Sequence, residues 1–167
     1  AGFDFSKLNS LGGVVANNSS SWSCVKDNLT GLVWEAKTND GGLHDYDISY
    51  AWYNTNTSNN GGFAGEQKTN NTQTFINTVN TQGLCGFKDW RLPTRQELET
   101  IIHYGQTTEA MIDNNLFVNT QKALYWTSVP VASSPTSAWA LSFLTAADSQ
   151  VYKGSLQYVR LVRGTQL

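Results

Sequence analysis

The feature that most constrains this chain is the segment 83–98, which holds one of only two cysteines. Within it, Trp90 and Leu92 alternate as they would in a strand that enters a core. A proline then ends the extended run. Thr94 and Glu97 have the spacing of a capping box, in which the hydroxyl accepts from the third amide and the carboxylate reaches back to the cap amide. The segment therefore predicts a sharp corner that leads into a helix.

The two cysteines, Cys24 and Cys85, enclose a long loop. We favour a disulfide between them, and the alternative is a pair of buried thiols. A disulfide across so long a loop would stabilise the fold by roughly 4 kcal/mol in the chain-entropy model. It would also imply an oxidising compartment, and so a secreted or cell-surface protein. The chain has no CxxC, CxxH or HExxH spacing, so the sequence does not predict a zinc site.

The composition narrows the class of protein further. The 167 residues fit a single domain over residues 1–167, and a chain that begins without Met suggests a module of a longer protein. Only 14% of the residues are charged and the net charge is −2, with no run of Lys or Arg, so nucleic acid is not an expected partner. No apolar run approaches the ~20 residues of a membrane span.

Hydrophobic periodicity predicts an α+β fold with an antiparallel sheet, two short helices and long loop excursions. We expect a hairpin around the turn at 27–31, a polar loop at 130–137, and pairing between the terminal strands. Residues 37–71 are expected to form a long ordered excursion that aromatic side chains hold in place. The predicted strands are at residues 1–13, 22–25, 32–35, 124–128, 138–143, 150–153 and 158–163. The predicted helices are at residues 72–80 and 95–104, and Gly83 is expected to form a left-handed cap after the first helix.

A series of ordered motifs extends over nearly the whole chain. They lie at residues 22–35, 37–38, 41–43, 83–86, 89–94, 97–98, 112–113, 117, 125–128, 138–139, 143 and 158–163. In these motifs the chain resembles the Lcl C-terminal domain family. The resemblance implies a C-type-lectin-like fold of the formylglycine-generating-enzyme type, in an exported bacterial protein. Relatives include an adhesin whose domain trimerises and binds sulfated glycosaminoglycans.

The leading functional hypothesis is a non-enzymatic adhesin or recognition domain that binds a glycan or a host or partner surface protein. Its binding surface is expected in loops 44–62, 129–137 and 144–157, because loops on a rigid scaffold usually carry binding residues. One alternative is a structural module that forms a homo-oligomer or filament in a pilus or envelope assembly. Another is an oxidoreductase related to formylglycine-generating enzyme, which would need free cysteines. The candidate ligand-binding residues are Tyr46, Tyr50, Trp52, Tyr53, Asp148, Gln150, Tyr152 and Lys153, with Trp52 as a sugar-stacking platform.

Few residues suggest an ion or a cofactor, and none suggests a catalytic group. Asp45 and Asp47 are weak candidates for calcium, but no EF-hand spacing is met and solvated turns explain them better. We expect His44 and His103 to be surface or hydrogen-bonded residues. The arginines Arg91, Arg160 and Arg163 are expected to bind the carboxylates of Asp27, Asp89 and Glu35, or backbone carbonyls. The less favoured alternative is a sulfate site formed by Lys122, Lys153, Arg160 and Arg163.

Overall fold

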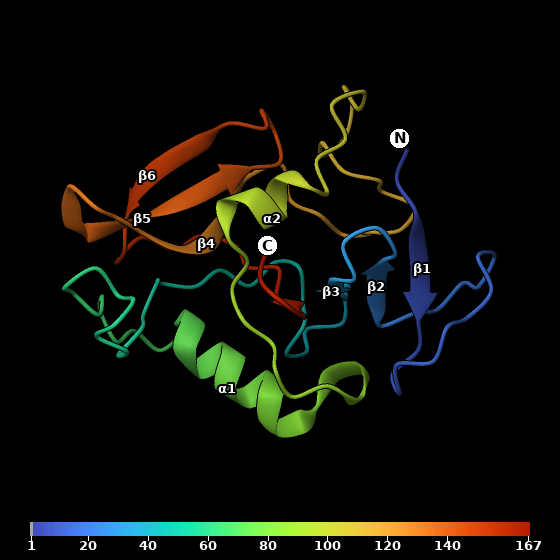
Figure 1. Ribbon diagram of the computed structural model, residues 1–167, viewed down its shortest axis with the longest axis horizontal. Helices are drawn as coiled ribbons and strands as arrows, with labels where there is room; N and C mark the ends of the chain where they lie inside the picture. Colours follow the sequence, from blue (N-terminus) through green and yellow to red (C-terminus); the bar gives the residue numbers. More distant parts are fainter. Residues whose placement is uncertain (1) are drawn as a thin grey trace.

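A computed structural model describes residues 2–167, so only Ala1 of the predicted domain lies outside it. Two small antiparallel sheets and two short helices form the fold (Figure 1), which confirms the α+β prediction but divides the expected single sheet into two. The first sheet has the order β1-β2-β3-β7 and the second the order β4-β5-β6. The bounds are β1 Phe5–Leu8, β2 Cys24–Asp27, β3 Val33–Glu35, α1 Thr72–Gln82, α2 Arg95–Glu99, β4 Leu124–Val131, β5 Ser134–Ser142, β6 Asp148–Tyr152 and β7 Val162–Arg163.

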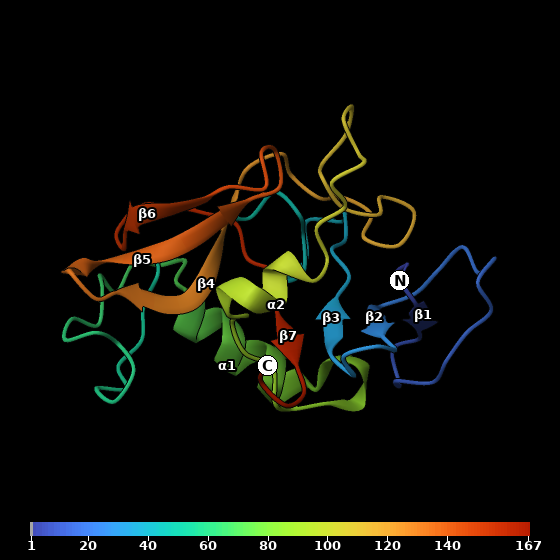
Figure 2. The same ribbon diagram turned by 45° about the horizontal axis from the view of Figure 1, so that its top comes forward.

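The central strands are buried on both faces, because the two helices belong to two different apolar clusters. Val33 of β3 packs in the cluster that includes Phe75 of α1, whereas the next residue, Trp34, packs in the cluster that includes Leu98 of α2. Figure 2 shows both helices with the strands of the two sheets around them. A strand that is buried on both faces shows no polar alternation in its sequence, which makes its ends hard to locate by periodicity.

The predicted disulfide between Cys24 and Cys85 is confirmed, with the two Cα atoms 6.6 Å apart. It ties β2 to the turn that follows α1. Helix α1 itself begins after Asn71, whose side chain accepts from the Thr74 amide, and it extends two residues beyond the predicted end. Gly83 then adopts the predicted left-handed conformation, with φ of 80°, and its amide donates to the helix.

The second helix starts as predicted and ends earlier than predicted. Both hydrogen bonds of the Thr94–Glu97 capping box are present. The helix ends at Glu99 and not at residue 104, because the amides of Ile101 and Ile102 each bond only three residues back, as in a 3₁₀ turn. Ile101 and Ile102 are still buried, at 1% and 3% exposure, so the inward stripe was predicted correctly and the helix length was not.

The predicted polar loop at 130–137 is wrong, because β4 and β5 extend through most of it. Only residues 132 and 133 connect the two strands. Pro130 lies within β4 opposite Ala138, beside an irregularity in the register. A proline is tolerated there because β4 is an edge strand of its sheet and is locally irregular. The proline and serine residues of this segment predicted a loop. The segment instead forms strand because β4 and β5 pair along most of their length.

The C-terminal strand is shorter than predicted and pairs differently. Strand β7 covers only residues 162–163 and pairs with β3, so the terminal strands β1 and β7 lie at opposite edges of one sheet and do not pair. Residues 158–161 instead connect the two sheets. The Tyr158 amide donates to Leu124 of β4, and Leu161 accepts from the Glu35 amide of β3. Within residues 2–167 we find no helix with the length and apolarity that crossing a membrane requires.

Candidate functional site

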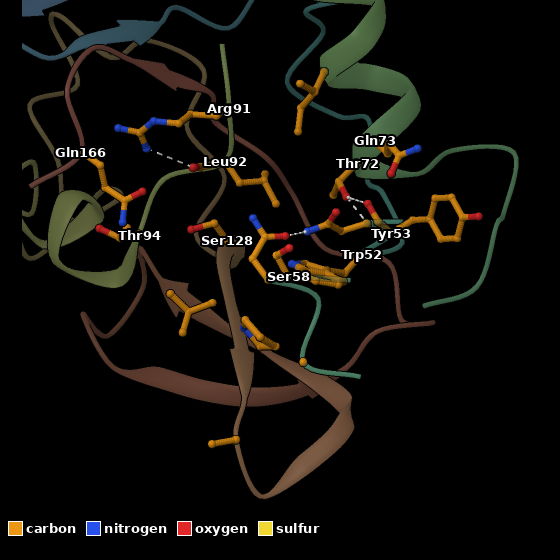
Figure 3. A pocket seen from close by; sticks show the side chains of 17 residues that line it. Trp52, Tyr53, Ser58, Thr72, Gln73, Arg91, Leu92, Thr94, Ser128 and Gln166 are labelled. Carbon is orange, nitrogen blue, oxygen red and sulfur yellow. Dashed lines mark hydrogen bonds between the residues drawn. The ribbon is translucent and has the colours of Figure 1, made fainter. Parts of the chain in front are cut away.

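A cavity of about 710 Å³ lies where the excursion, α1 and the β4–β5 hairpin meet. Figure 3 shows its lining side chains converging from these elements. The excursion contributes residues between 52 and 61, α1 contributes its first turns, and the hairpin contributes residues between 128 and 132. The corner at 91–94 and Gln166 near the C-terminus complete the lining. The cavity therefore uses two of the three predicted binding loops and none of loop 144–157.

Trp52 forms a largely buried part of the cavity wall. Its side chain is 1% exposed, and its indole Nε1 donates to the Thr127 carbonyl at 2.9 Å. On one ring face, the Lys153 Nζ lies 4.4 Å from the ring centroid. The cation therefore occupies one face of the indole, and the hydrogen bond fixes its orientation. Trp52 lines the cavity, but its burial does not fit an exposed stacking platform, and ligand binding by Trp52 stays a prediction.

Lys153 is buried, contrary to the expectation of a ligand-facing side chain. It is 0% exposed, and its Nζ donates to the carbonyls of Asn60 at 2.8 Å and Phe63 at 2.6 Å. Burial lowers the pKa of the Lys153 ammonium. Within the described chain no carboxylate pairs with it, so carbonyl dipoles and the Trp52 ring stabilise the charge. Lys153 thus fastens the excursion to the end of β6 and positions the cavity wall.

The first turn of α1 holds the other side of the excursion. Thr72 Oγ1 donates to the Tyr53 carbonyl and accepts from the Tyr53 amide, both at 3.0 Å. Gln73 Oε1 accepts from the Thr55 amide at 2.8 Å. Sequence reasoning missed Thr72 and Gln73 as cavity residues. Their place beside the Asn71 cap predicted a helix start, but no local pattern indicated which loop they would contact.

Several polar side chains at the cavity are available to a ligand. Among the hydrogen bonds of residues 2–167, none involves the hydroxyls of Ser58 or Ser128, the side-chain amide of Gln166, or Nε2 of Gln73. These groups offer both donors and acceptors beside the apolar surfaces of Ile76 and the hairpin. The combination suits a ligand that has hydroxyl or amide groups on an apolar frame.

The one charged side chain in the cavity lining, Arg91, is already neutralised. Its guanidinium donates to both carboxylate oxygens of Glu97, at 2.8 and 2.7 Å, so its partner is not one of the three carboxylates that we expected. Burial alone would raise the pKa of Glu97, but Arg91 and the Thr94 amide lower it below its usual range. The cavity therefore has no unpaired charge among its described lining residues.

The other two arginines follow the expectations more closely. Arg163 forms the predicted bidentate pair with Asp89, at 3.0 and 2.8 Å. Arg160 is buried and donates to the backbone carbonyl of Glu35 at 2.6 Å, which is the predicted alternative to an ion pair. Since Arg160 and Lys153 are both 0% exposed, the four basic residues of the sulfate hypothesis do not form one surface patch.

Glu35 is the centre of a buried charge cluster outside the cavity. Its carboxylate accepts from Lys37 at 3.0 Å, from the Leu161 amide at 2.9 Å, and lies 2.7 Å from Nδ1 of His44. Burial alone would raise the pKa of Glu35, but Lys37 and His44 lower it to about 2. The cluster joins β3 to the start of the excursion, which indicates a structural role for the predicted hydrogen-bonded His44.

The remaining predicted ligand residues lie outside the cavity. Of the eight, only Trp52 and Tyr53 line it. Tyr50 is buried and stacks on Phe75 with ring centroids 4.6 Å apart, so it cannot offer a sugar its ring face. Asp148 pairs with Arg95, and the Tyr152 hydroxyl donates to Glu66. Gln150 is exposed on β6, and Tyr46 is half-buried. Ligand binding by any of the eight stays a prediction.

The two calcium candidates have different surroundings. Asp45 is buried, and its carboxylate accepts from the backbone amides of Asp40, Gly41 and Asp47 at 2.7 to 3.0 Å. Asp47 is exposed and accepts from Gln121 at 3.1 Å. The described residues contain no group of three or more His, Cys, Asp or Glu placed to hold a metal. The bonds of Asp45 give it a loop-organising role, and calcium binding stays untested.

The comparisons with known proteins agree with the motifs. The model of the Lcl C-terminal domain family matches residues 23–163, which is most of the chain. This match confirms the resemblance drawn from the motifs. No curated protein matches the chain.

Proposed function

We propose, because the chain belongs to the Lcl C-terminal domain family, that it is an exported, non-enzymatic recognition domain. It binds a carbohydrate or a host or partner surface molecule in the cavity beside Trp52. The disulfide supports export to an oxidising compartment. The family membership and the long irregular excursion between small sheets support a C-type-lectin-like arrangement.

The observation that carries this proposal is the composition of the cavity. A volume of about 710 Å³ lies within the range of known ligand sites, roughly 300–1,000 Å³. Apolar side chains such as Ile76 and Leu92 share the lining with unpaired hydroxyl and amide groups. Such a surface can pack against the apolar face of a ligand while it satisfies the ligand's polar groups, as recognition of a sugar requires.

The charge of the cavity narrows the ligand class. Arg91 is the only charged residue in the described lining, and Glu97 satisfies it through two hydrogen bonds. An anionic ligand would have to compete with that carboxylate for the guanidinium. We therefore propose a neutral polyhydroxylated ligand in preference to a highly sulfated one.

The state of the cysteines bears on the oxidoreductase alternative. Both cysteines are in the disulfide, and none is free. The oxidoreductase alternative needs a thiolate, so it has no support from the cysteines in this state. The proposal of a binding domain rests on the cavity and on the family membership.

The test is a screen for glycan binding, followed by affinity measurements on two single-residue variants of the β4–β5 hairpin. The folded domain should bind members of an array of neutral glycans, and Ser128→Leu, which places a larger side chain at the cavity, should weaken binding at least about tenfold. Ser133→Leu is the matched control, because Ser133 is exposed in the same hairpin and does not line the cavity. An array without binding, or equal affinities of Ser128→Leu and the original protein, would contradict the proposal.

A further inference from the structure

The two sheets have four edges, and three of them have backbone partners. At β1, the Val15 amide donates to the Lys7 carbonyl. At β4, the Trp126 amide donates to Tyr158, and at β7 Val162 exchanges two hydrogen bonds with Arg91. The fourth edge is β6, which lies at the periphery of the molecule in both views (Figures 1 and 2). Open edges attract other strands, and proteins usually cover or disfavour them.

The register of β6 shows which of its backbone groups point outward. The Lys153 amide donates to Thr136, and Ala147 accepts from the Ser142 amide, both at 2.9 Å and both toward β5. Since hydrogen-bonded and non-bonded pairs alternate in an antiparallel ladder, Ser149 and Val151 also face β5. The N–H and C=O groups of the three intervening residues, 148, 150 and 152, therefore point away from the sheet.

These outward groups are almost all unpartnered. Within residues 2–167, no backbone or side-chain group bonds to the N–H or C=O of Asp148 or Gln150, or to the N–H of Tyr152. The Tyr152 carbonyl accepts from the Ser155 amide at 2.9 Å and keeps a second lone pair. The edge thus offers a symmetric row of donors and acceptors centred on Gln150.

We propose that β6 of one molecule pairs antiparallel with β6 of a second copy, around a two-fold axis at Gln150. In this register the two Gln150 residues exchange both backbone hydrogen bonds. Asp148 of each copy then lies opposite Tyr152 of the other, so every outward donor meets an outward acceptor. The result is a continuous six-stranded sheet across the two copies, and the interface is isologous, as two-fold symmetry requires.

The side chains of β6 favour this register. Asp148 of each copy lies opposite Tyr152 of the other, and the two Gln150 amides lie opposite each other. No two negatively charged residues of β6 are therefore opposite each other in this register. Asp148 is also paired with Arg95. The strand Asp148–Tyr152 contains no Lys, Pro or bulge, which are the usual obstacles to edge pairing. The strand itself therefore carries none of these obstacles to a second copy.

Exposed apolar side chains lie near both ends of this strand. Leu144, in the β5–β6 connection, is 55% exposed, and Leu156, after β6, is 51% exposed. In antiparallel pairing the start of one strand lies beside the end of the other. Leu144 of each copy is then at the same end of the interface as Leu156 of its partner, so pairing can shield two exposed leucines at each end.

The proposed dimer leaves the cavity open. None of the residues that line the cavity belongs to β6. A contact through one short strand buries little surface, so we expect a weak, concentration-dependent dimer. Two open cavities on one assembly would bind a surface that displays many ligands more tightly than one cavity does.

The first test is hydrogen exchange of the β6 amides at increasing protein concentration. The amides of Asp148, Gln150 and Tyr152 should become protected as the concentration rises. Those of Ser149 and Val151 should be protected throughout, because they already bond to β5. An unchanged exchange rate at Gln150, with sedimentation showing only monomer at the highest soluble concentration, would overturn the proposal.

The second test is a substitution that removes only the outward hydrogen bond. Gln150→Pro eliminates an N–H that points away from β5, so the β5–β6 ladder keeps its bonds and the domain should fold. The dimer loses two hydrogen bonds and gains a steric obstacle, so its dissociation constant should rise at least about tenfold. Gln150→Thr keeps the backbone donor and should dimerise like the original protein.

A further variant covers the case in which the proline prevents folding. Gln150→Lys places two like charges opposite each other at the two-fold axis, so it should weaken the dimer, and added salt should restore it. At least one of Gln150→Pro and Gln150→Lys should fold. If that folded variant dimerises with the affinity of the original protein, the interface lies elsewhere and the proposal is overturned.

Discussion

The segment 83–98, which contains the corner, and the excursion at residues 37–71 both consist largely of irregular backbone, but different interactions hold them. The corner is fixed by a covalent bond at Cys85, by the capping box, and by the two hydrogen bonds between Arg91 and Glu97. These ties are close in sequence, except for the disulfide, and Glu97 takes part in two of them. Only the disulfide shares no residue with the other ties.

The excursion is held by contacts with elements outside it, one adjacent in sequence and others far away. At its start, Lys37 and His44 bind the buried Glu35 of β3. Further along, Thr72 holds Tyr53, and Lys153 of the segment after β6 holds two carbonyls. Most of the other side-chain hydrogen bonds within it are short contacts of Asn and Asp with the nearby backbone. The position of the cavity wall therefore depends on a few contacts between segments that are far apart in the sequence.

The largest expected effect comes from breaking the corner. Cys85→Ser removes a disulfide that spans 61 residues, which should cost about 4 kcal/mol of unfolding free energy in the chain-entropy model. Chemical denaturation of the variant and of the original protein measures this loss. Ligand affinity, measured where the variant is fully folded, should not change, because Cys85 does not line the cavity.

The partner cysteine provides the control for this experiment. Cys24→Ser and the double variant should lose about as much stability as Cys85→Ser, since each removes the same bond. A variant with unchanged stability that no longer binds ligand would show that the corner acts in recognition and not as scaffold.

The features that could be predicted from the sequence are those whose cause is local. The capping box needs only Thr94 and Glu97, and the left-handed cap needs only Gly83 after an apolar helix face. The hairpin between β2 and β3 follows from a turn of a few residues. With only two cysteines in the chain, the disulfide had one possible pairing, and that pairing is confirmed. The motifs indicated the family, and the family match is confirmed as well.

The features that could not be predicted depend on long-range contacts. Lys153 and Asn60 are 93 residues apart, and no pattern in either segment indicates that a carbonyl will bind that ammonium. The split into two sheets likewise depends on residues 158–161, which bond to β4 and then to β3. The sequence pattern of residues 158–161 is the same whether they form one strand or connect two sheets, so the pattern predicted one strand.

A smaller effect is expected from titrating the excursion's first anchor. The pKa of Glu35 is lowered from 4.5 to about 2, so its carboxylate contributes stability above the unfolded-state pKa. This contribution should disappear as the pH falls from about 4.5 through about 2, when the folded protein also takes up the proton. The difference corresponds to roughly 3 kcal/mol, at about 1.4 kcal/mol per pKa unit. Unfolding free energies measured across this pH range test it.

Glu35→Gln isolates this group from the other carboxylates. It should be less stable at neutral pH, because Lys37 stays buried without its charged partner. It should also lose stability less steeply than the original protein as the pH falls through this range. Identical pH profiles for the two proteins would mean that Glu35 does not carry the acid sensitivity, and that the excursion is not anchored by this charge cluster.

The smallest of the three effects, and the most informative for the cavity, is expected at Lys153. Lys153→Met keeps the length and apolar stem but leaves the Asn60 and Phe63 carbonyls without their donor, which should cost about 2 kcal/mol. Because those carbonyls belong to the segment that borders the cavity, ligand affinity should fall as well. Lys68→Met is the control, since that exposed side chain bonds to Gly154 and should change stability by less than about 1 kcal/mol. Equal stability and ligand affinity of the two variants would contradict the conclusion that one buried cation positions the excursion. The short Asn and Asp contacts would then account for its order.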